Sequence, residues 1–125
     1  MAVYGAYADH VTRVIGTTRR GEHPGRGAFR ILLADEFSRT NPGVATAIPR
    51  GTRLRTYRAG SGTVRITLSQ RFARLTGKRL RLALAQIVFT ASDLPGARRV
   101  LVRTEAGALT GFHRPLTTAD FRALS

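Results

Sequence analysis

The segment from residue 43 to residue 105 constrains the fold more than any other part of the chain. Two runs of β-prone residues, 53–59 and 63–68, flank the three small residues 60–62, and such spacing is typical of a tight β-hairpin. In the second run, apolar residues alternate with polar ones, which predicts a strand with one buried face and one wet face. The segment therefore predicts a small sheet with a face that another layer must cover.

A helix and a third strand complete the same segment. Between residues 79 and 91, apolar residues recur at the spacing of one helical face. Ser69 is a good N-cap for a short helical turn before this helix, and Gly77 should separate the two. Alternation resumes over residues 99–104, which predicts a strand that ends at the turn Ala106-Gly107.

The N-terminal third is less regular. Two apolar clusters within residues 3–15 predict a β-ribbon or a bent strand that turns at Asp9-His10. Residues 16–27 are polar and rich in glycine, which predicts a flexible loop. Apolar residues at helical spacing predict a helix over residues 28–37, and Pro42-Gly43 prevents its continuation.

The C-terminal residues 108–125 are interpreted as an extension that packs on the domain. Its end, residues 116–121, has the pattern of a capped final turn with Phe121 docked on the body. The complete order β, α, β, β, α, β predicts one α+β domain over residues 1–125. We expect a two-layer sandwich in which two helices pack on one face of a small mixed or antiparallel sheet.

Length and composition agree with a single globular domain. A chain of 125 residues has room for one core, and its 42% hydrophobic and 22% charged residues are not typical of disorder. The absence of cysteine excludes disulfides and cysteine-based metal sites. The longest nearly apolar run, 82–91, is too short to span a bilayer. No export signal is visible, so the protein is expected to be cytoplasmic or to be exported by a region outside this chain.

The chain is strongly basic, with 21 lysine and arginine residues against 7 acids and a net charge of +14. One interpretation is a surface that binds a polyanion, such as nucleic acid or an anionic envelope polymer. The other is a genome rich in G and C, which favours arginine over lysine, and Lys78 is indeed the only lysine. Whatever its origin, the positive field predicts non-specific binding of nucleic acid at low salt.

Several short motifs, in their order and spacing, resemble one known family over nearly the whole chain. They are Leu32-Leu33, the run 48–54 (Ile-Pro-Arg-Gly-Thr-Arg-Leu), the run 68–72 (Leu-Ser-Gln-Arg-Phe), the run 86–90 (Gln-Ile-Val-Phe-Thr) and the strand 100–107. The chain is similar to the GerMN domain, also called the sporulation and spore germination domain. It departs from the family pattern in Ala34-Asp35-Glu36, which follow Leu32-Leu33, and in Gly5-Ala6 in the first strand.

The resemblance implies a non-catalytic interaction module that acts outside the cytoplasm. Such domains occur in sporulation proteins and in actinobacterial lipoproteins of the LpqB type, so the full-length protein would be membrane-associated. The implied partner is a protein of the cell envelope, with a sensor kinase or a multi-protein assembly as candidates, or an anionic polymer. The family offers no catalytic residue to transfer to this chain.

The residues themselves predict no catalytic, cofactor or metal site. The three histidines, His10, His23 and His113, lie in different predicted loops or turns, which argues against a shared metal. Asp35 and Glu36 are adjacent near the end of a predicted helix and are interpreted as partners of Arg39. No serine lies in a nucleophile motif, and the glycine-rich loop has no phosphate-binding pattern.

A strand face supplies the candidate partner site. If apolar residues of the strands face the helices, a second face combines arginine with some apolar surface. The candidate residues on this face are Arg53, Arg55, Tyr57, Arg65, Leu101 and Arg103. Two interpretations remain open: a solvated face shielded by arginine stems, or a docking face for an acidic partner.

The alternative function is a cytoplasmic nucleic-acid-binding domain. The β, α, β, β, α, β order is shared with domains that stack RNA bases on aromatic residues of the central strands. The run 63–68 has no aromatic residue, and Tyr57 alone would form a small platform. This comparison favours the interaction module.

Overall fold

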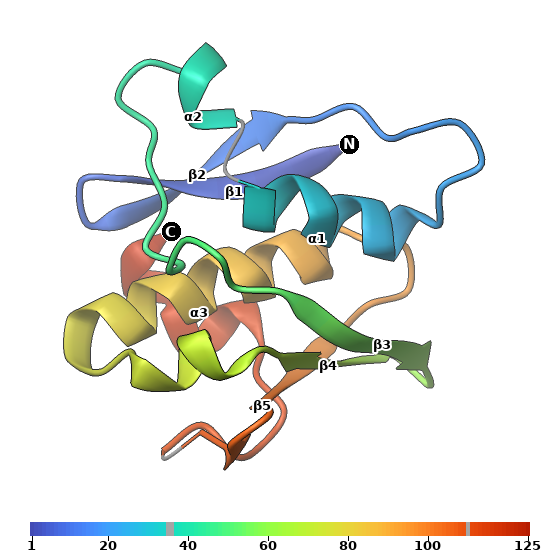
Figure 1. Ribbon diagram of the computed structural model, residues 1–125, viewed down its shortest axis with the longest axis vertical. Helices are drawn as coiled ribbons and strands as arrows, with labels where there is room; N and C mark the ends of the chain where they lie inside the picture. Colours follow the sequence, from blue (N-terminus) through green and yellow to red (C-terminus); the bar gives the residue numbers. More distant parts are fainter. Residues whose placement is uncertain (35–36, 110) are drawn as a thin grey trace.

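The computed structural model describes residues 1–34, 37–109 and 111–125 (Figure 1). The helices and strands, in chain order, are β1 (Ala2–Tyr7), β2 (His10–Ile15), α1 (Pro24–Ala34), α2 (Phe37–Thr40), β3 (Leu54–Gly60), β4 (Thr63–Leu68), the 3-10 helix η1 (Gln70–Arg74), α3 (Gly77–Ser92), β5 (Arg99–Thr104), β6 (Gly107–Ala108) and the 3-10 helix η2 (Thr118–Leu124).

Helices α1 and α3 lie at the centre of the molecule, between two sheets (Figure 1). On one side is a four-stranded sheet in the order β3-β4-β5-β6, and on the other is the β1–β2 ribbon. The predicted α+β class, with helices on one face of a mixed sheet, is confirmed. The N-terminal hairpin does not add a strand to that sheet, because β1 pairs along its length with β2 and covers the far side of the helices.

The four-stranded sheet combines both strand directions. Strands β3 and β4 are antiparallel, β4 and β5 are parallel, and α3 is the connection between the parallel pair. The β3–β4 turn contains two residues, Ser61 and Gly62, with φ of 53° and 79°. Positive φ at both positions is what a two-residue hairpin turn of the favoured twist requires. The loop is one residue shorter than predicted, since Gly60 still pairs with Thr63.

Alternation along β4 and β5 places the core on the helix side of the sheet. Val64 and Ile66 are each 2% exposed, and their β5 partners Val100 and Val102 are fully buried. Fully buried side chains of α3 belong to the same core, among them Leu84, Ile87 and Val88. The strand pattern predicted from the sequence is therefore confirmed in β4 and β5.

Helix α1 begins at Pro24, four residues before the predicted start. Proline suits the first position of a helix because its missing N–H would be unsatisfied there in any case. The imidazole Nδ1 of His23 accepts hydrogen bonds from the N–H groups of Gly25 (3.1 Å) and Arg26 (3.4 Å), so this histidine caps the helix. The predicted partnership of Asp35 and Glu36 with Arg39 lies outside the described residues.

The turn after β4 differs from its prediction in one detail. Ser69 does occupy the N-cap position of η1, but its side chain makes no capping bond. Its Oγ instead accepts a hydrogen bond from the backbone N–H of Arg53 at 2.8 Å. The serine therefore fastens the start of β3 to the end of β4.

Two buried polar residues of α3 attach the rest of the chain to the helix. The amide of Gln86 donates to the carbonyl of Tyr4 (3.1 Å) and accepts from the N–H of Ala47 (2.7 Å). One turn further along, the Thr90 hydroxyl accepts from the N–H of Tyr4 at 3.0 Å. The polar members of the run 86–90 thus hold the β1–β2 ribbon and the 46–47 segment against α3.

The C-terminal segment returns to the body of the domain. Leu116 and Val100 exchange two backbone hydrogen bonds, of 2.8 and 2.7 Å. A capping box formed by Thr117 and Asp120 begins η2, and Phe121 is fully buried. The guanidinium of Arg81 lies over the Phe121 ring at 5.3 Å and also donates to the carbonyl of Asp120.

Candidate interaction surface

The sheet face that points away from the helices is lined by arginine. Its register places Arg58 opposite Arg65, and Arg65 opposite Leu101 on the next strand. Arg103 pairs with Thr67 on the same face. The arginines are exposed and Leu101 is half-buried. We call Arg58, Arg65, Leu101 and Arg103 the open sheet face.

Three of the six predicted residues, Arg65, Leu101 and Arg103, come together on the open sheet face. Arg53 precedes β3, and the Arg55 guanidinium is 3.2 Å from the carboxylate of Glu105. Tyr57 was predicted for this face, and that prediction is wrong. It pairs with the buried Ile66 and therefore lies on the helix side.

A β-bulge explains why Tyr57 is not on the open sheet face and why Arg58, which was not predicted, is. The β3–β4 register shifts between Leu54 and Thr56. One extra residue in a strand exchanges the two faces for every residue beyond it. Arg58 consequently occupies the open sheet face in place of Tyr57. An unbroken alternation in the sequence gives no sign of such a bulge.

Tyr57 instead joins β3 to the first turn of α1. Its ring packs edge-on against His23 at 5.3 Å between centroids, and Phe29 lies at 6.1 Å. The Arg26 guanidinium lies 5.8 Å from the ring centroid. Burial raises the pKa of the phenol, and the nearby positive charge of Arg26 opposes that rise.

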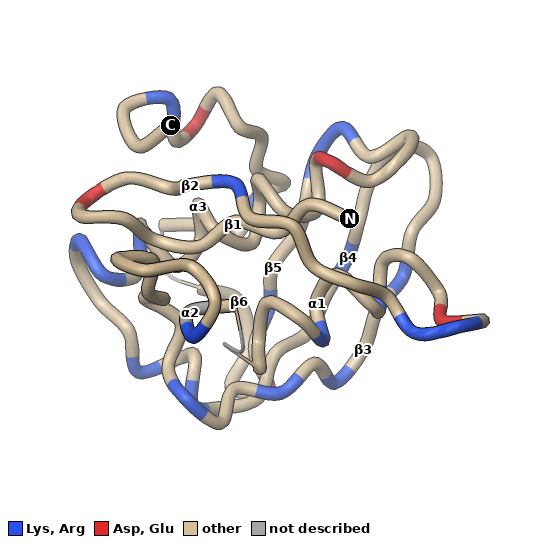
Figure 2. The backbone as a smooth tube through the Cα atoms, turned by 90° about the horizontal axis from the view of Figure 1, so that it is seen from above, with Lys and Arg blue, Asp and Glu red and all other residues tan. Residues whose placement is uncertain are grey.

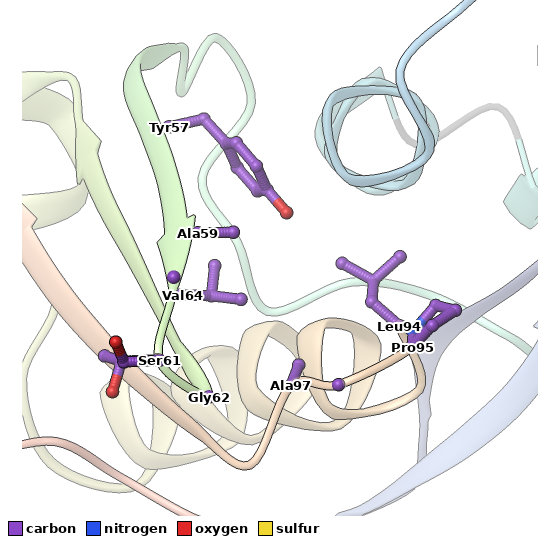
Figure 3. A pocket seen from close by; sticks show the side chains of 11 residues that line it. Tyr57, Ala59, Ser61, Gly62, Val64, Leu94, Pro95 and Ala97 are labelled. Atoms are coloured by element: carbon purple, nitrogen blue, oxygen red, sulfur yellow. The ribbon is translucent and has the colours of Figure 1, made fainter.

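The same tyrosine borders a small pocket of about 270 Å³ between the β3–β4 hairpin and the loop after α3. Figure 3 shows Tyr57, Ala59 and Val64 on the strand side and Leu94 and Pro95 across from them. The Tyr57 side chain extends from β3 toward α1. Among the described residues that line this pocket, none carries a carboxylate or an imidazole, the groups most often used for acid–base chemistry.

Basic positions are spread over the backbone and greatly outnumber acidic ones (Figure 2). Within the described residues, three ion pairs are formed: Arg30–Glu22 at 2.7 Å, Arg55–Glu105 at 3.2 Å and Arg114–Asp120 at 2.8 Å. The hydrogen bond from Arg30, followed by one from the Arg19 N–H, lowers the pKa of Glu22 to about 2. Each of these three acids neutralises one arginine. Because the chain has 21 basic residues and only 7 acids, most of its positive charge is not neutralised by acids.

Across residues 1–34, 37–109 and 111–125, no three histidine or acidic side chains gather as metal ligands would. Over these ranges, no helix combines the length and the apolar character needed to cross a bilayer.

Comparison with known proteins identifies the family. The family model Germane, described as sporulation and spore germination, matches residues 4–106. The chain belongs to the Germane family. The β1–β2 ribbon from Tyr4 onward, both central helices and the sheet through β5 all lie within the matched region of this Germane domain.

Solved structures show the same fold. The first GerMN domain of the sporulation protein GerM from Bacillus subtilis superposes with a TM-score of 0.69 at 12% identity, over 94% of this chain and 95% of that one. The tandem GerMN domains of GerM give 0.70 at 11% identity, over 94% of this chain, and this Germane domain spans 44% of the tandem chain. A putative lipoprotein from Clostridium perfringens gives 0.67 at 16% identity, over 100% of this chain and 91% of that one. A search of curated proteins found no match.

Proposed function

We propose that this Germane domain is a non-catalytic interaction module of a bacterial cell envelope, which binds a protein partner through its open sheet face. The observation that carries the proposal is the face itself. Arg58, Arg65 and Arg103 extend around Leu101 on a sheet whose other face is fixed by the core. Such a surface is already ordered before binding, which reduces the entropy lost on association.

The location in the envelope is proposed from the family and its structural neighbours. The family is described by sporulation and spore germination, and one neighbour is a putative lipoprotein. The full-length protein would then be membrane-associated and extracytoplasmic. The candidate partners are a sensor kinase or a component of a multi-protein assembly.

The proposed mechanism is surface complementarity. Arginine can bind a carboxylate through two parallel hydrogen bonds, and such charge-assisted bonds are stronger than neutral ones. Half-buried Leu101 would supply apolar contact between the charged groups. The charges would speed association and select an acidic partner, while the apolar contact would contribute to affinity.

The test compares two triple variants of equal charge. In one, Arg58, Arg65 and Arg103 become Glu on the open sheet face. In the control, the exposed Arg13, Arg20 and Arg122 become Glu elsewhere on the surface. Each protein is immobilised, incubated with envelope extract of the source bacterium at physiological salt, and the retained proteins are identified by mass spectrometry.

The proposal expects an envelope protein that is retained by the unmodified domain and the control, but lost from the open-face variant. Circular dichroism must show that both variants are folded. Retention of the same proteins by all three would contradict the proposed face. A bound fraction that nuclease treatment removes would instead favour the cytoplasmic nucleic-acid alternative.

A further inference from the structure

A second basic surface lies on a different part of the molecule, in a groove between α1 and the beginning of β3. Its volume is about 590 Å³. Arg26 and Arg30 line it from the helix, and Arg53 and Arg55 line it from the strand side. We call this the α1–β3 groove. The two elements lie next to each other in the fold (Figures 1 and 2).

Two leucines line the groove, and we call them its apolar floor. Leu33 of α1 and Leu54 of β3 both line it, and both are half-buried against the core. A groove with charged rims and an apolar floor differs from the open sheet face, where one leucine lies among arginines. It suits a ligand that carries negative charge and apolar groups on the same short segment.

The charges of the rims are not equivalent. Arg30 is held by Glu22, and Arg55 is held by Glu105. Among the ion pairs of the described residues, none involves Arg26 or Arg53, and both side chains are exposed. Arg26, whose guanidinium also contacts the Tyr57 ring, and Arg53 are therefore the groups that can bind a ligand carboxylate, one from each wall. No acidic residue is among those that line the groove.

The walls set the length of the ligand. Residues 52–55, which lead into β3, extend for roughly 10 Å at the rise of a strand. Residues 26–34 of the helix extend for about 12 Å at the helical rise. Strand β3 is also the outer strand of its sheet, and no strand within the described residues pairs with its other edge. The matched lengths fit an extended peptide of about four residues.

We infer that the α1–β3 groove binds a short, extended, acidic segment of a protein, with carboxylates on Arg26 and Arg53 and an apolar side chain on Leu33 and Leu54. A phosphate polymer would use the arginines but would gain nothing from the apolar floor. The inference goes beyond the proposed function, because it concerns different residues and a different class of contact.

The probe is the peptide Gly-Glu-Leu-Glu-Leu-Gly, with both ends blocked, titrated into the isotopically labelled domain at physiological salt and followed by two-dimensional NMR. We expect the amide signals of residues 52–55 and of the α1 residues that line the groove to shift. The peptide with Gln in place of Glu, and the peptide with Gly in place of Leu, should each bind at least tenfold more weakly.

Two sets of variants make the test specific. Arg26→Gln with Arg53→Gln should weaken peptide binding at least tenfold, whereas the control Arg13→Gln with Arg20→Gln should change it less than twofold. Leu33→Ala should weaken binding of the Glu-Leu peptide but leave the weaker Glu-Gly peptide unchanged. The open-face triple variant should still show the same groove signals shifting.

The inference is overturned if the Gln peptide binds as tightly as the Glu peptide, or if the Arg26 and Arg53 variant binds normally. It is also overturned if inorganic tripolyphosphate moves the same signals at lower concentration than the peptide, since the apolar floor would then have no role. Retention of envelope proteins tests the open sheet face, and peptide titration tests the α1–β3 groove. A negative result in one experiment therefore does not contradict the other proposal.

Discussion

The side chain of Gln86 is fully buried, and its amide still makes hydrogen bonds to two separate segments. Its oxygen accepts a hydrogen bond from the N–H of Ala47, and its nitrogen donates one to the carbonyl of Tyr4. A single residue therefore joins a helix, a strand and a loop. A buried polar group without a partner is destabilising, which makes such a residue hard to replace.

The substitution Gln86→Leu should lower the free energy of unfolding by about 3 kcal/mol, because the N–H of Ala47 and the carbonyl of Tyr4 would both lose their partner. Chemical denaturation measures the change. The exposed Gln70 is the matched control, and Gln70→Leu should stay within about 0.5 kcal/mol of the unmodified protein. Equal losses for the two variants would contradict the role assigned to Gln86.

Glu22 gives a second prediction at this scale. Its pKa is lowered from 4.5 to about 2, so the stabilisation from its ion pair is complete above pH 4.5 and is lost as the pH falls toward 2. Titration of the carboxyl by NMR should show a midpoint near the lower value. In Arg30→Gln the midpoint should rise toward 4.5, because the main cause of the lowered pKa has been removed. An unchanged midpoint would show that Arg30 is not that cause.

Among the elements, the contact between α1 and β3 depends on a glycine. Gly25 lies in the first turn of α1, and a Cβ atom at this position would overlap the Tyr57 hydroxyl. The helix can approach the strand this closely only because the residue has no side chain. The same close contact holds the two walls of the α1–β3 groove together.

Gly25→Ala should therefore destabilise the domain by about 1–3 kcal/mol, because the tyrosine ring must move out of a packed site. The effect should shrink when Tyr57 is already Ala, since the overlapping atoms are then absent. Thermal unfolding of the two single variants and the double variant measures this coupling. Gly60 is the control: an added Cβ meets no atom within 4 Å there, so Gly60→Ala should show no coupling to Tyr57.

Elements defined by local patterns could be predicted from the sequence, and elements defined by pairing could not. The alternation in residues 63–68 and 99–104 fixed both strands, since each strand buries one face. A ribbon was one of the two predictions for residues 3–15, and β1 and β2 form it. Its separation from the four-stranded sheet and the bulge at Arg55 depend on which strands pair, which no short pattern reports. Hence half of the predicted partner-binding residues were placed together, while Arg58 and the groove arginines of α1 were missed.

At the scale of the whole molecule, the net charge of +14 acts as a long-range field rather than as a site. Most basic groups are spread around the surface (Figure 2). Such a field attracts any polyanion when salt is low, and counterions weaken that attraction as salt rises.

We expect the dissociation constant for a random DNA duplex to rise at least about tenfold between roughly 50 and 200 mM NaCl, as for binding dominated by phosphate contacts. Fluorescence anisotropy measures it. The open-face variant and its charge-matched control should bind the duplex more weakly than the unmodified domain, and both by the same factor. Binding that depends on sequence, or that persists at the higher salt, would support the nucleic-acid alternative.

The hydrogen bonds between β1 and α3 also bear on how the chain acquires its fold during synthesis. Tyr4 bonds to residues 82 and 86 positions further along the chain. At about 5–20 residues per second, the ribosome needs roughly 4–16 seconds to make that distance. Throughout this interval α3 is missing, and the ribbon has only α1 to pack against, although Val3 and Val14 are buried in the finished domain. The N-terminal ribbon is thus synthesised first but can dock completely only after α3 is made, and until then part of its apolar face is open to neighbouring nascent chains.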